Sequence, residues 1–437
     1  MPLPRITVFH GGLGDSRVAE LAACAPSVRS WDWDLRCVRT RGGDEGPSRV
    51  QRLPDGPEDS VLADAAARAV GCRGAFELWG EGETLEACGA ATRRVPVDHV
   101  RARVPGPWRV VSVVLGALRS PLEADLGARM DAFGHVLDPL ADRPVRLQGP
   151  ATELWLVEDR RVLEAGGPLP GRPPRFRLLL RLPSDVPDTR DTMKALDLRR
   201  RAFLGTSTLP PDRALLLSNL ALRDAGPGAT LLDPFCGSGG VLLAAASLGA
   251  RVTGSDLDWR MVSDNRVPIQ IPATRDRPER GVEAVRMRDN FDEAGLPGPQ
   301  ALLVLDVGAP DAVSRLLTVN GGRSYDAVVT DPPYGRREFQ GGEDAWDGAL
   351  TFRVDAGSLA VTLTRLMDLC TGLLRPGGRL VFLAPVRSPR DPSKPTLTEL
   401  RTWLQAQGED RGMVLWHLAE ERVHRGLHRA VVGMERR

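Results

Sequence analysis

The ten residues from 231 to 240, LLDPFCGSGG, constrain the fold of this chain more than any other segment. An apolar, strand-like run ends at Asp233, a glycine-rich turn follows, and the apolar segment 241–249 then has a helical composition. Glycine lets a backbone approach a ligand closely, and a helix begins with unsatisfied N–H groups that face it. The order of strand, turn and helix therefore predicts a parallel sheet with a small-molecule cofactor at its carboxyl edge.

Three acidic residues at predicted strand ends indicate which cofactor that is. Asp233 suits the ammonium group of an amino acid, which a dinucleotide lacks, and the GxGxxG pattern of dinucleotide folds is absent from this turn. Asp256 ends the next predicted strand and suits two ribose hydroxyls, while Asp306 closes the third and suits an adenine amino group. The alternative, a tight turn without a ligand, requires all three acids to be placed by chance. We therefore predict S-adenosylmethionine as the cofactor, with further contacts from Phe235, Cys236, Gly237, Gly239 and Leu257.

A second motif, Asp-Pro-Pro-Tyr at residues 331–334, follows another predicted strand. The lone pair of an amino group on a nucleobase is delocalised into the ring, so a methyltransferase has to localise it. We expect Asp331 and the carbonyl of Pro332 to accept the two N–H groups, Pro333 to keep the loop rigid and Tyr334 to stack on the base. The alternative is an ordinary proline turn. Because the segment follows a cofactor motif, we favour a methyl-transfer site over an ordinary proline turn.

The chain changes its pattern near residue 199. From there on, predicted strands alternate with helices, which is typical of a parallel sheet. A long apolar helix over residues 359–374 is expected to stop at the Pro-Gly-Gly of residues 376–378. The predicted strands are residues 230–233, 251–256, 301–307, 327–330, 379–383 and 414–418.

The N-terminal half mixes short strands with helices, which suggests one or two α+β modules. Strands are predicted at residues 6–10, 108–116, 152–159 and 175–182, and helices at residues 15–24, 61–70 and 120–133. Residues 42–58 are rich in Gly and Pro and are expected to form a loop.

Length and composition limit the class of protein. At 437 residues with 42% hydrophobic content, about three domains can each bury a core. No apolar run approaches the roughly 20 residues of a membrane span, and no signal sequence is visible, so we expect a soluble, cytoplasmic protein. The six cysteines and six histidines lack metal-ligand spacing, so we expect reduced thiols and no metal. Cys236 is expected to be a small loop residue rather than a nucleophile.

The net charge of +1 neither indicates nor excludes nucleic-acid binding, because 58 basic residues nearly cancel 57 acidic ones. Local basic clusters are of the kind that contacts phosphates, although solvated helix ends are the ordinary explanation for any one of them. They occur at residues 93–94, 101–103, 199–201 and 336–337.

Five segments together resemble the signature blocks of the THUMP-containing tRNA (guanosine-10 N2) methyltransferase family of eukaryotes and archaea. They are RRRAFLGTSTLPPDRALLLSNLAL at 199–222, LLDPFCGSGG, GSDLD at 254–258, RDNF at 288–291 and YDAVVTDPPYGRRE at 325–338. A looser match at FELWGEG, residues 76–82, extends the resemblance into the N-terminal half. Thr208 and Ala294 depart from the family pattern without touching the chemistry directly.

The resemblance implies a domain plan and further site residues. Its plan is a ferredoxin-like segment over 1–90, a THUMP-like RNA-binding module over 91–182, a linker over 183–198 and a Rossmann-like methyltransferase domain over 199–437, with a mostly parallel seven-stranded sheet. The family motifs imply roles near the cofactor methionine for Arg201, Gly205, Thr206, Ser207 and Asn219. They imply roles beside the substrate for Arg199, Arg200, Arg336 and Glu338.

The apolar strand predicted at residues 301–307 lies at the sheet edge in the methyltransferase fold that this sequence resembles. Unpaired N–H and C=O groups at an edge invite another chain. The resemblance suggests as partner the small zinc-binding activator subunit shared by several eukaryotic methyltransferases. The alternative is that the N-terminal half of this protein covers the strand.

The sequence therefore predicts a methyltransferase acting on the 2-amino group of guanosine 10 in tRNA. The first alternative is an adenine N6-methyltransferase of DNA or RNA, which would use the same Asp-Pro-Pro-Tyr logic. The segment at 206–208 and the extension at 335–338 argue against it. The second alternative is an RNA-binding scaffold with a vestigial cofactor site, which the intact Asp233, Asp256 and Asp331 disfavour.

Overall fold

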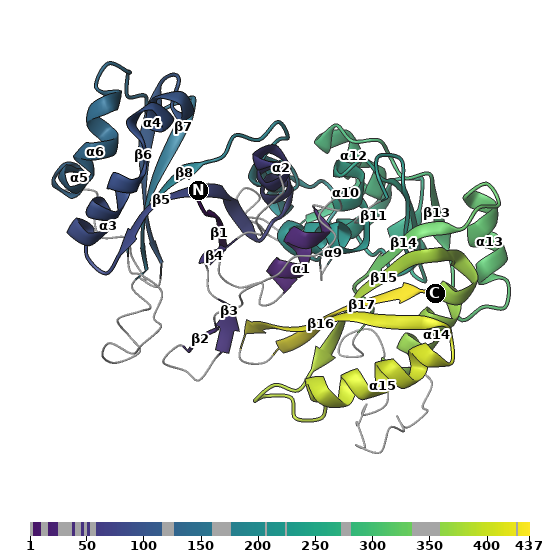
Figure 1. Cartoon of the computed structure of the whole chain (residues 1–437). Coiled ribbons are helices and arrows are strands. Elements are labelled where there is room, and N and C mark those ends of the chain that lie inside the picture. Colours follow the sequence, from purple (N-terminus) through teal and green to yellow (C-terminus); the bar gives the residue numbers. More distant parts are fainter. Residues whose placement is uncertain are drawn as a thin grey trace. The chain divides into compact units, whose positions relative to one another are not determined.

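The computed structural model describes residues 3–9, 16–24, 37–39, 45–47, 50–52, 58–115, 126–159, 176–205, 208–222, 225–271, 281–333, 359–424 and 427–437. The chain forms two compact units, each built around its own sheet (Figure 1). Unit 1 comprises residues 1–11, 27–68 and 72–186, and unit 2 comprises residues 12–26, 69–71 and 187–437. Among the described residues, no helix is long and apolar enough to cross a membrane.

Unit 2 contains a seven-stranded sheet in the order β13-β10-β9-β14-β15-β17-β16. All neighbours from β13 to β15 pair in parallel, and β17 alone runs against the other six strands. This confirms the mostly parallel seven-stranded sheet expected of a Rossmann-like methyltransferase domain. The strands are β9 (Thr230–Asp233), β10 (Arg251–Asp256), β13 (Ala301–Val304), β14 (Tyr325–Thr330), β15 (Leu374–Val386), β16 (Met413–His424) and β17 (Leu427–Arg436).

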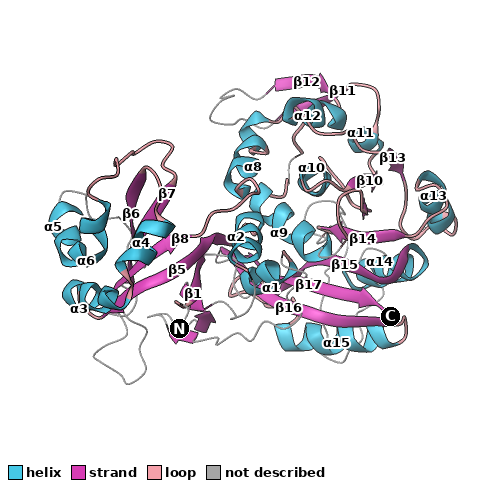
Figure 2. Ribbon diagram, turned by 45° about the horizontal axis from the view of Figure 1, so that its top comes forward, coloured by secondary structure: helices cyan, strands magenta, loops and turns pink. Residues whose placement is uncertain are grey.

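Alternating residues of these strands bury two separate cores, one on each face of the sheet. Leu231 and Val329 belong to one core together with helices α9 and α10, whereas Leu232 and Val328 belong to the other with α13, α14 and α15. Because successive strand residues point to opposite faces, strands covered on both sides are apolar without interruption. The helices of the unit lie on both sides of the sheet (Figure 2).

The helical and remaining elements of unit 2 connect these strands. They are α1 (Ser16–Ala23), α8 (Thr189–Ala195), the 3₁₀ helix η5 (Leu198–Arg200), α9 (Pro211–Leu222), α10 (Gly240–Ser247), α11 (Trp259–Val262), β11 (Val267–Ile271), β12 (Gly281–Val285), α12 (Met287–Ala294), α13 (Ala312–Val319), α14 (Leu359–Leu373) and α15 (Leu397–Glu409).

Several strand predictions in unit 2 are confirmed, and three details differ. β9 and β10 have the predicted bounds, but β13 ends at Val304, three residues earlier than predicted. The segment 376–378 does not separate α14 from the next strand: β15 begins at Leu374, and Gly377 takes a φ of +72° within it. The last strand of the sheet, β17, is not among the six strands that the sequence predicts.

Unit 1 is built on a six-stranded sheet in the order β4-β1-β5-β8-β7-β6. One core contains Leu154, Leu156 and Leu178, and the opposite face buries Trp155 and Leu179. Its strands are β1 (Arg5–Phe9), β4 (Val50–Arg52), β5 (Cys72–Gly82), β6 (Trp108–Leu115), β7 (Thr152–Asp159) and β8 (Phe176–Arg181), with a separate pair formed by β2 (Cys37–Arg39) and β3 (Glu45–Pro47).

The helices of unit 1 are short. They are α2 (Asp59–Arg68), α3 (Leu85–Ala91), η1 (Thr92–Arg94), α4 (Val97–Arg103), α5 (Leu126–Met130), η3 (Asp131–Phe133), α6 (Gly134–Leu137) and η4 (Asp138–Leu140).

Two N-terminal predictions need correction. The segment 42–58, expected to be a loop, contributes β3, β4 and the first residues that lead into α2, because β4 gains ladder hydrogen bonds from β1. The predicted helix over 120–133 is divided into α5 and η3 where it is described, and residues 120–125 lie outside the described part. The expected boundary at residue 90 and the expected linker over 183–198 stay predictions. In the structure, β1, β5 and β6–β8 share one sheet, and α8 lies within 183–198.

Candidate functional site

The glycine turn that follows β9 has a backbone that other residues would not tolerate. Gly237 has a φ of +48° and Gly239 a φ of +80°, both in the left-handed region. A Cβ on Gly239 would lie 2.8 Å from Sδ of Met287, whereas no described atom lies within 4 Å of a Cβ on Gly237. The turn therefore leaves open space above Gly237 and leads directly into α10, whose N-terminus has no side-chain cap.

Asp233 lies at the end of β9 and is almost fully buried. Its Oδ1 accepts the hydroxyl of Thr330 at 2.7 Å and the N–H of Phe235 at 3.1 Å. Burial raises the pKa of Asp233 to about 7, and the nearby negative charges of Asp256 and Asp331 act in the same direction. Both donors are neutral, so the described residues do not supply a positive charge to this carboxylate by a hydrogen bond.

Asp256 lies at the end of β10, next to the same turn. Its Oδ2 accepts the N–H of Gly237 at 2.9 Å, and its Oδ1 accepts the N–H of Asp258 at 2.9 Å. Burial raises the pKa of this carboxyl group as well. Asp256 thus orients the glycine turn and stands beside Asp233 at one edge of the sheet, as the sequence predicts for adjacent parallel strands.

Asp331 directly follows Thr330, the last residue of β14, and is half-buried. Pro332 is buried and Pro333 is half-buried. The hydrogen bond from Thr330 to Asp233 ties the ends of β14 and β9 together. The two predicted centres, the cofactor turn and the Asp-Pro-Pro segment, therefore meet at one sheet edge. Tyr334, Arg336 and Glu338 lie outside the described residues, as do Thr206 and Ser207.

The other predicted cofactor residues differ in exposure. Asp306 is exposed two residues beyond β13, and its carboxylate accepts the N–H of Gly308 at 2.8 Å. Leu257 is 63% exposed, and Phe235 packs against the second core of unit 2. Cys236 is buried, and burial raises the pKa of its thiol well above the ordinary value. A thiol held protonated in this way is a poor nucleophile.

The basic residues that precede α9 have separate environments. Arg199 forms an ion pair with Asp197 at 2.5 Å, Arg200 is exposed, and Arg201 is buried. The side chain of Asn219 donates to Glu20 of α1 at 2.8 Å, and its implied role near the cofactor methionine stays a prediction.

Two buried polar residues were not identified by the sequence analysis. Thr330 donates its hydroxyl to Asp233, and its position before the Asp-Pro-Pro motif is a local signal that could have identified it. Glu20 is fully buried and accepts the N–H groups of Val70 and Gly71, both at 2.9 Å, besides the amide of Asn219. It has no local signal, because its partners are far away in the sequence.

The chain is similar to known methyltransferases. Residues 199–344 match the family model UPF0020, described as an RMKL-like methyltransferase domain. The chain is 24% identical over 345 residues to tRNA (guanine(10)-N(2))-methyltransferase TRMT11 of Gallus gallus, covering 76% of this chain and 70% of that protein. It is also 24% identical over 282 residues to tRNA (guanine(10)-N(2))-methyltransferase of Saccharomyces cerevisiae, covering 64% and 58%.

Among solved structures, TrmN from Thermus thermophilus is similar with a TM-score of 0.42 and 19% identity, covering all of both chains. The curated relatives confirm the resemblance to the guanosine-10 family that the sequence motifs indicated.

Proposed function

We propose that this chain is an S-adenosylmethionine-dependent tRNA methyltransferase that methylates the 2-amino group of guanosine 10. The observation that carries the proposal is the hydrogen bond from Thr330 to Asp233. It brings the glycine turn and the Asp-Pro-Pro segment to one edge, so that a cofactor at the first would lie beside an amino group at the second. The names of the curated relatives support the substrate and the modified atom.

The residues at the turn fit S-adenosylmethionine. The buried carboxylate of Asp233 suits the ammonium group of the methionine part, and Asp256 suits the ribose hydroxyls. The open space above Gly237 would admit the cofactor, and the exposed Asp306 and Leu257 would contact the adenine. When bound, the cofactor supplies a methyl group on a positively charged sulfur.

Asp331 and Pro332 prepare the nucleophile in this proposal. Hydrogen bonds from the two N–H groups of the base to the Asp331 carboxylate and the Pro332 carbonyl localise the nitrogen lone pair. The rigid proline backbone keeps both acceptors in place, which makes positioning the main contribution to the rate. After methyl transfer, Asp331 or water takes the extra proton.

The N-terminal half would hold the RNA. We infer that its THUMP-like module binds tRNA through shape and phosphates, that Arg199 and Arg200 contact the backbone, and that the target guanosine leaves its stack to reach Asp331. A cytoplasmic location is part of this proposal.

The edge strand β13 supports the proposed partner. Among the described strands, β13 pairs only with β10, and Val304 at its end is 47% exposed. A strand added by the small zinc-binding activator subunit would pair with these free edge groups. We expect coexpression with this subunit to give a heterodimer that is more active than the chain alone. Val304→Lys should weaken the heterodimer. A chain that is monomeric, well behaved and fully active when purified alone would contradict the partnership.

The function is tested by identifying the modified nucleoside. Purified enzyme with its partner should convert unmodified tRNA to a product containing N2-methylguanosine at position 10, and Asp331→Ala should lower the rate by about 10²-fold or more. Asp311→Ala, at an exposed acid beside α13, is the matched control. N6-methyladenine in DNA or RNA would instead establish the first alternative. A calorimetric titration without cofactor binding, even with the partner present, would establish the scaffold.

A further inference from the structure

A cavity of about 170 Å³ lies in unit 2 between α8, η5, α10 and α12. It is separate from the Asp-Pro-Pro segment, since neither Asp233 nor Asp331 lines it. Its lining residues are Ala195, Leu196, Arg200, Arg201, Leu243, Asn290, Glu293 and Ala294.

Arg201 is the unusual member of this lining. Its side chain is only 4% exposed, and its Nε donates to the carbonyl of Leu196 at 3.3 Å. Neither Nη1 nor Nη2 has a hydrogen-bond partner among the described residues. Burial lowers the pKa of Arg201 to about 10, which reflects the cost of keeping this charge away from water. Two buried N–H₂ groups without acceptors at a cavity call for an acceptor from outside.

The surrounding charges favour an anion. Nη1 of Arg201 lies 3.6 Å from the point that a Cβ on Gly240 would occupy, at the N-terminus of α10, where the helix dipole is positive. Arg200 adds a second guanidinium at the exposed side of the cavity. Glu293 is the opposing charge in the lining, and its Oε2 accepts the N–H of Ala202 at 3.1 Å. Outside the lining, Asp197 acts on Arg201 through its charge.

The neutral polar group of the cavity is already engaged. The side-chain amide of Asn290 accepts from the N–H of Phe203 and donates to its carbonyl, both at 2.8 Å. The donors that remain for a ligand are therefore those of Arg200 and Arg201. Two arginines that line one small cavity suit a phosphate, which accepts several N–H donors at once.

We propose that this cavity binds one phosphate group of the substrate RNA backbone, with Arg201 at its floor and Arg200 at its rim. The proposal rests on the proposed function, because it assigns a contact to the RNA that the enzyme would methylate. Arg201 then acts as a positioning residue for the tRNA. The same oxyanion chemistry would suit the carboxylate of the cofactor, and the experiments below separate the two sources.

The first experiment uses inorganic phosphate as the probe and needs no activity. Calorimetric titration of the full chain should detect phosphate binding, and Arg201→Met should weaken it by about tenfold or more. Glu293→Gln keeps an acceptor for Ala202 but removes the opposing charge, so it should tighten binding several-fold. Arg200→Gln, at an exposed position, should weaken binding less and remains informative if Arg201→Met does not fold. Phosphate affinities that are equal in all four proteins would overturn the site.

The second experiment identifies the source of the phosphate. Binding of unmodified tRNA to the full chain with its partner is measured across salt concentrations. Arg201→Met should reduce the slope of log K against log salt by about one, without changing the affinity for S-adenosylmethionine. A lower cofactor affinity with an unchanged slope would assign the cavity to the cofactor and overturn the proposal. Failure of the proposed function would be seen separately, as the wrong modified nucleoside in the Asp331 assay.

Discussion

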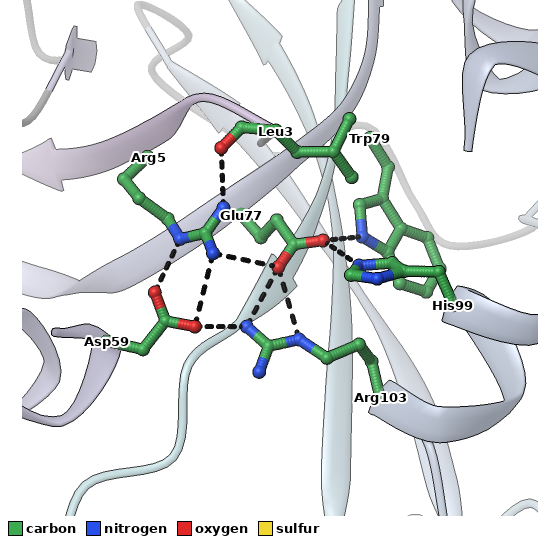
Figure 3. A network of polar contacts seen from close by, with 7 residues as sticks. All are labelled: Leu3, Arg5, Asp59, Glu77, Trp79, His99 and Arg103. Carbon is green, nitrogen blue, oxygen red and sulfur yellow. Dashed lines mark hydrogen bonds and ion pairs between the residues drawn. The ribbon is translucent and has the colours of Figure 1, made fainter. Parts of the chain in front are cut away.

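Glu77 in unit 1 and Asp233 in unit 2 are both buried carboxylates on inner strands of a sheet, yet their surroundings differ. Oε1 of Glu77 accepts hydrogen bonds from Nε1 of Trp79 at 3.0 Å and from Nε2 of His99 at 2.5 Å (Figure 3). Oε2 accepts two hydrogen bonds from the guanidinium of Arg103, at 3.1 and 2.8 Å. Arg5 lies 3.5 Å from the same oxygen. Among the described residues, the hydrogen bonds that Asp233 accepts come from a hydroxyl and a backbone N–H.

This difference separates a structural charge from a binding charge. Arg5 and Arg103 also bind Asp59, so the network in unit 1 balances two cations with two carboxylates and joins β1, α2, β5 and α4. Removing one partner of a buried ion pair of this kind strongly destabilises the folded state. In unit 2, Asp233 and Arg201 are buried without such compensation, and their pKa values move toward the neutral forms. Uncompensated charges in a cleft mark the positions where a ligand supplies the opposite charge.

The largest expected effect is on the stability of unit 1. Glu77→Ala leaves Arg103 and Arg5 with one carboxylate fewer, and we expect it to lower the free energy of unfolding by about 3–5 kcal/mol. Urea unfolding followed by circular dichroism measures this. Arg101→Ala, which breaks an exposed ion pair with Asp142, is the control and should leave the unfolding midpoint unchanged. If both variants lower the free energy of unfolding equally, Glu77 is not a specially important structural charge.

The second prediction concerns Asp233. Asp233→Asn keeps an acceptor for Thr330 but removes the charge, and we expect kcat/KM for the methyl transfer to fall by about 10²-fold. The thermal midpoint should not fall, because the change removes an uncompensated buried charge. The measurements are initial rates on tRNA and differential scanning calorimetry. A destabilisation as large as that of Glu77→Ala would show that Asp233 is structural.

The third prediction is a pH dependence of stability in unit 2. Burial raises the pKa values of Asp233 and Glu20 to about 7, above those of the unfolded chain. The folded state therefore holds more protons between about pH 4 and 7, and stability falls as the pH rises through this window. His417 has the opposite influence, because burial lowers its pKa to about 4 and stability rises between about pH 4 and 6.5.

Mutation separates the effect of the two carboxyl groups from that of His417. Each carboxyl group should contribute on the order of 1–3 kcal/mol, and the double variant Asp233→Asn with Glu20→Gln should lose the decrease between about pH 4 and 7. Urea unfolding at a series of pH values measures it. A decrease that persists in the double variant would assign the pH dependence to other groups.

The smallest expected effect sharpens the role of Thr330. Its hydrogen bond lowers the pKa of Asp233 against the effect of burial, so Thr330→Val should raise that pKa further. We expect the midpoint of the pH dependence of cofactor affinity to move upward by about one unit or less. The matched control is Thr371→Val, because the hydroxyl of Thr371 donates to the carbonyl of Met367 within α14. An unchanged midpoint would show that Thr330 does not tune Asp233.

Local patterns allowed much of unit 2 to be predicted. The bounds of β9 and β10 and the meeting of Asp233, Asp256 and Asp331 follow from strands that end in acids beside glycine or proline turns. These signals lie within a few residues of one another, so no tertiary information is needed. The same is true of Gly237 and Gly239, whose positive φ values explain the glycines of the turn.

Features that depend on distant contacts could not be predicted. β4 forms in a Gly- and Pro-rich segment because β1 offers it a ladder, and Asn219 donates to Glu20, which is far away in the sequence. The cavity at Arg201 combines residues of four elements, and composition alone contains no trace of it.

The buried bond between Glu20 and Asn219 sets an order of events during protein synthesis. The two residues are 199 positions apart, and α1 packs against α9 in the finished molecule. At a translation rate of about 5–20 residues per second, α1 leaves the ribosome roughly 10–40 s before its partner helix exists. The apolar side of α1 must stay exposed, or be shielded by a chaperone, during that interval. A nascent chain stalled before residue 211 would therefore present the first helix of this protein to any protease nearby.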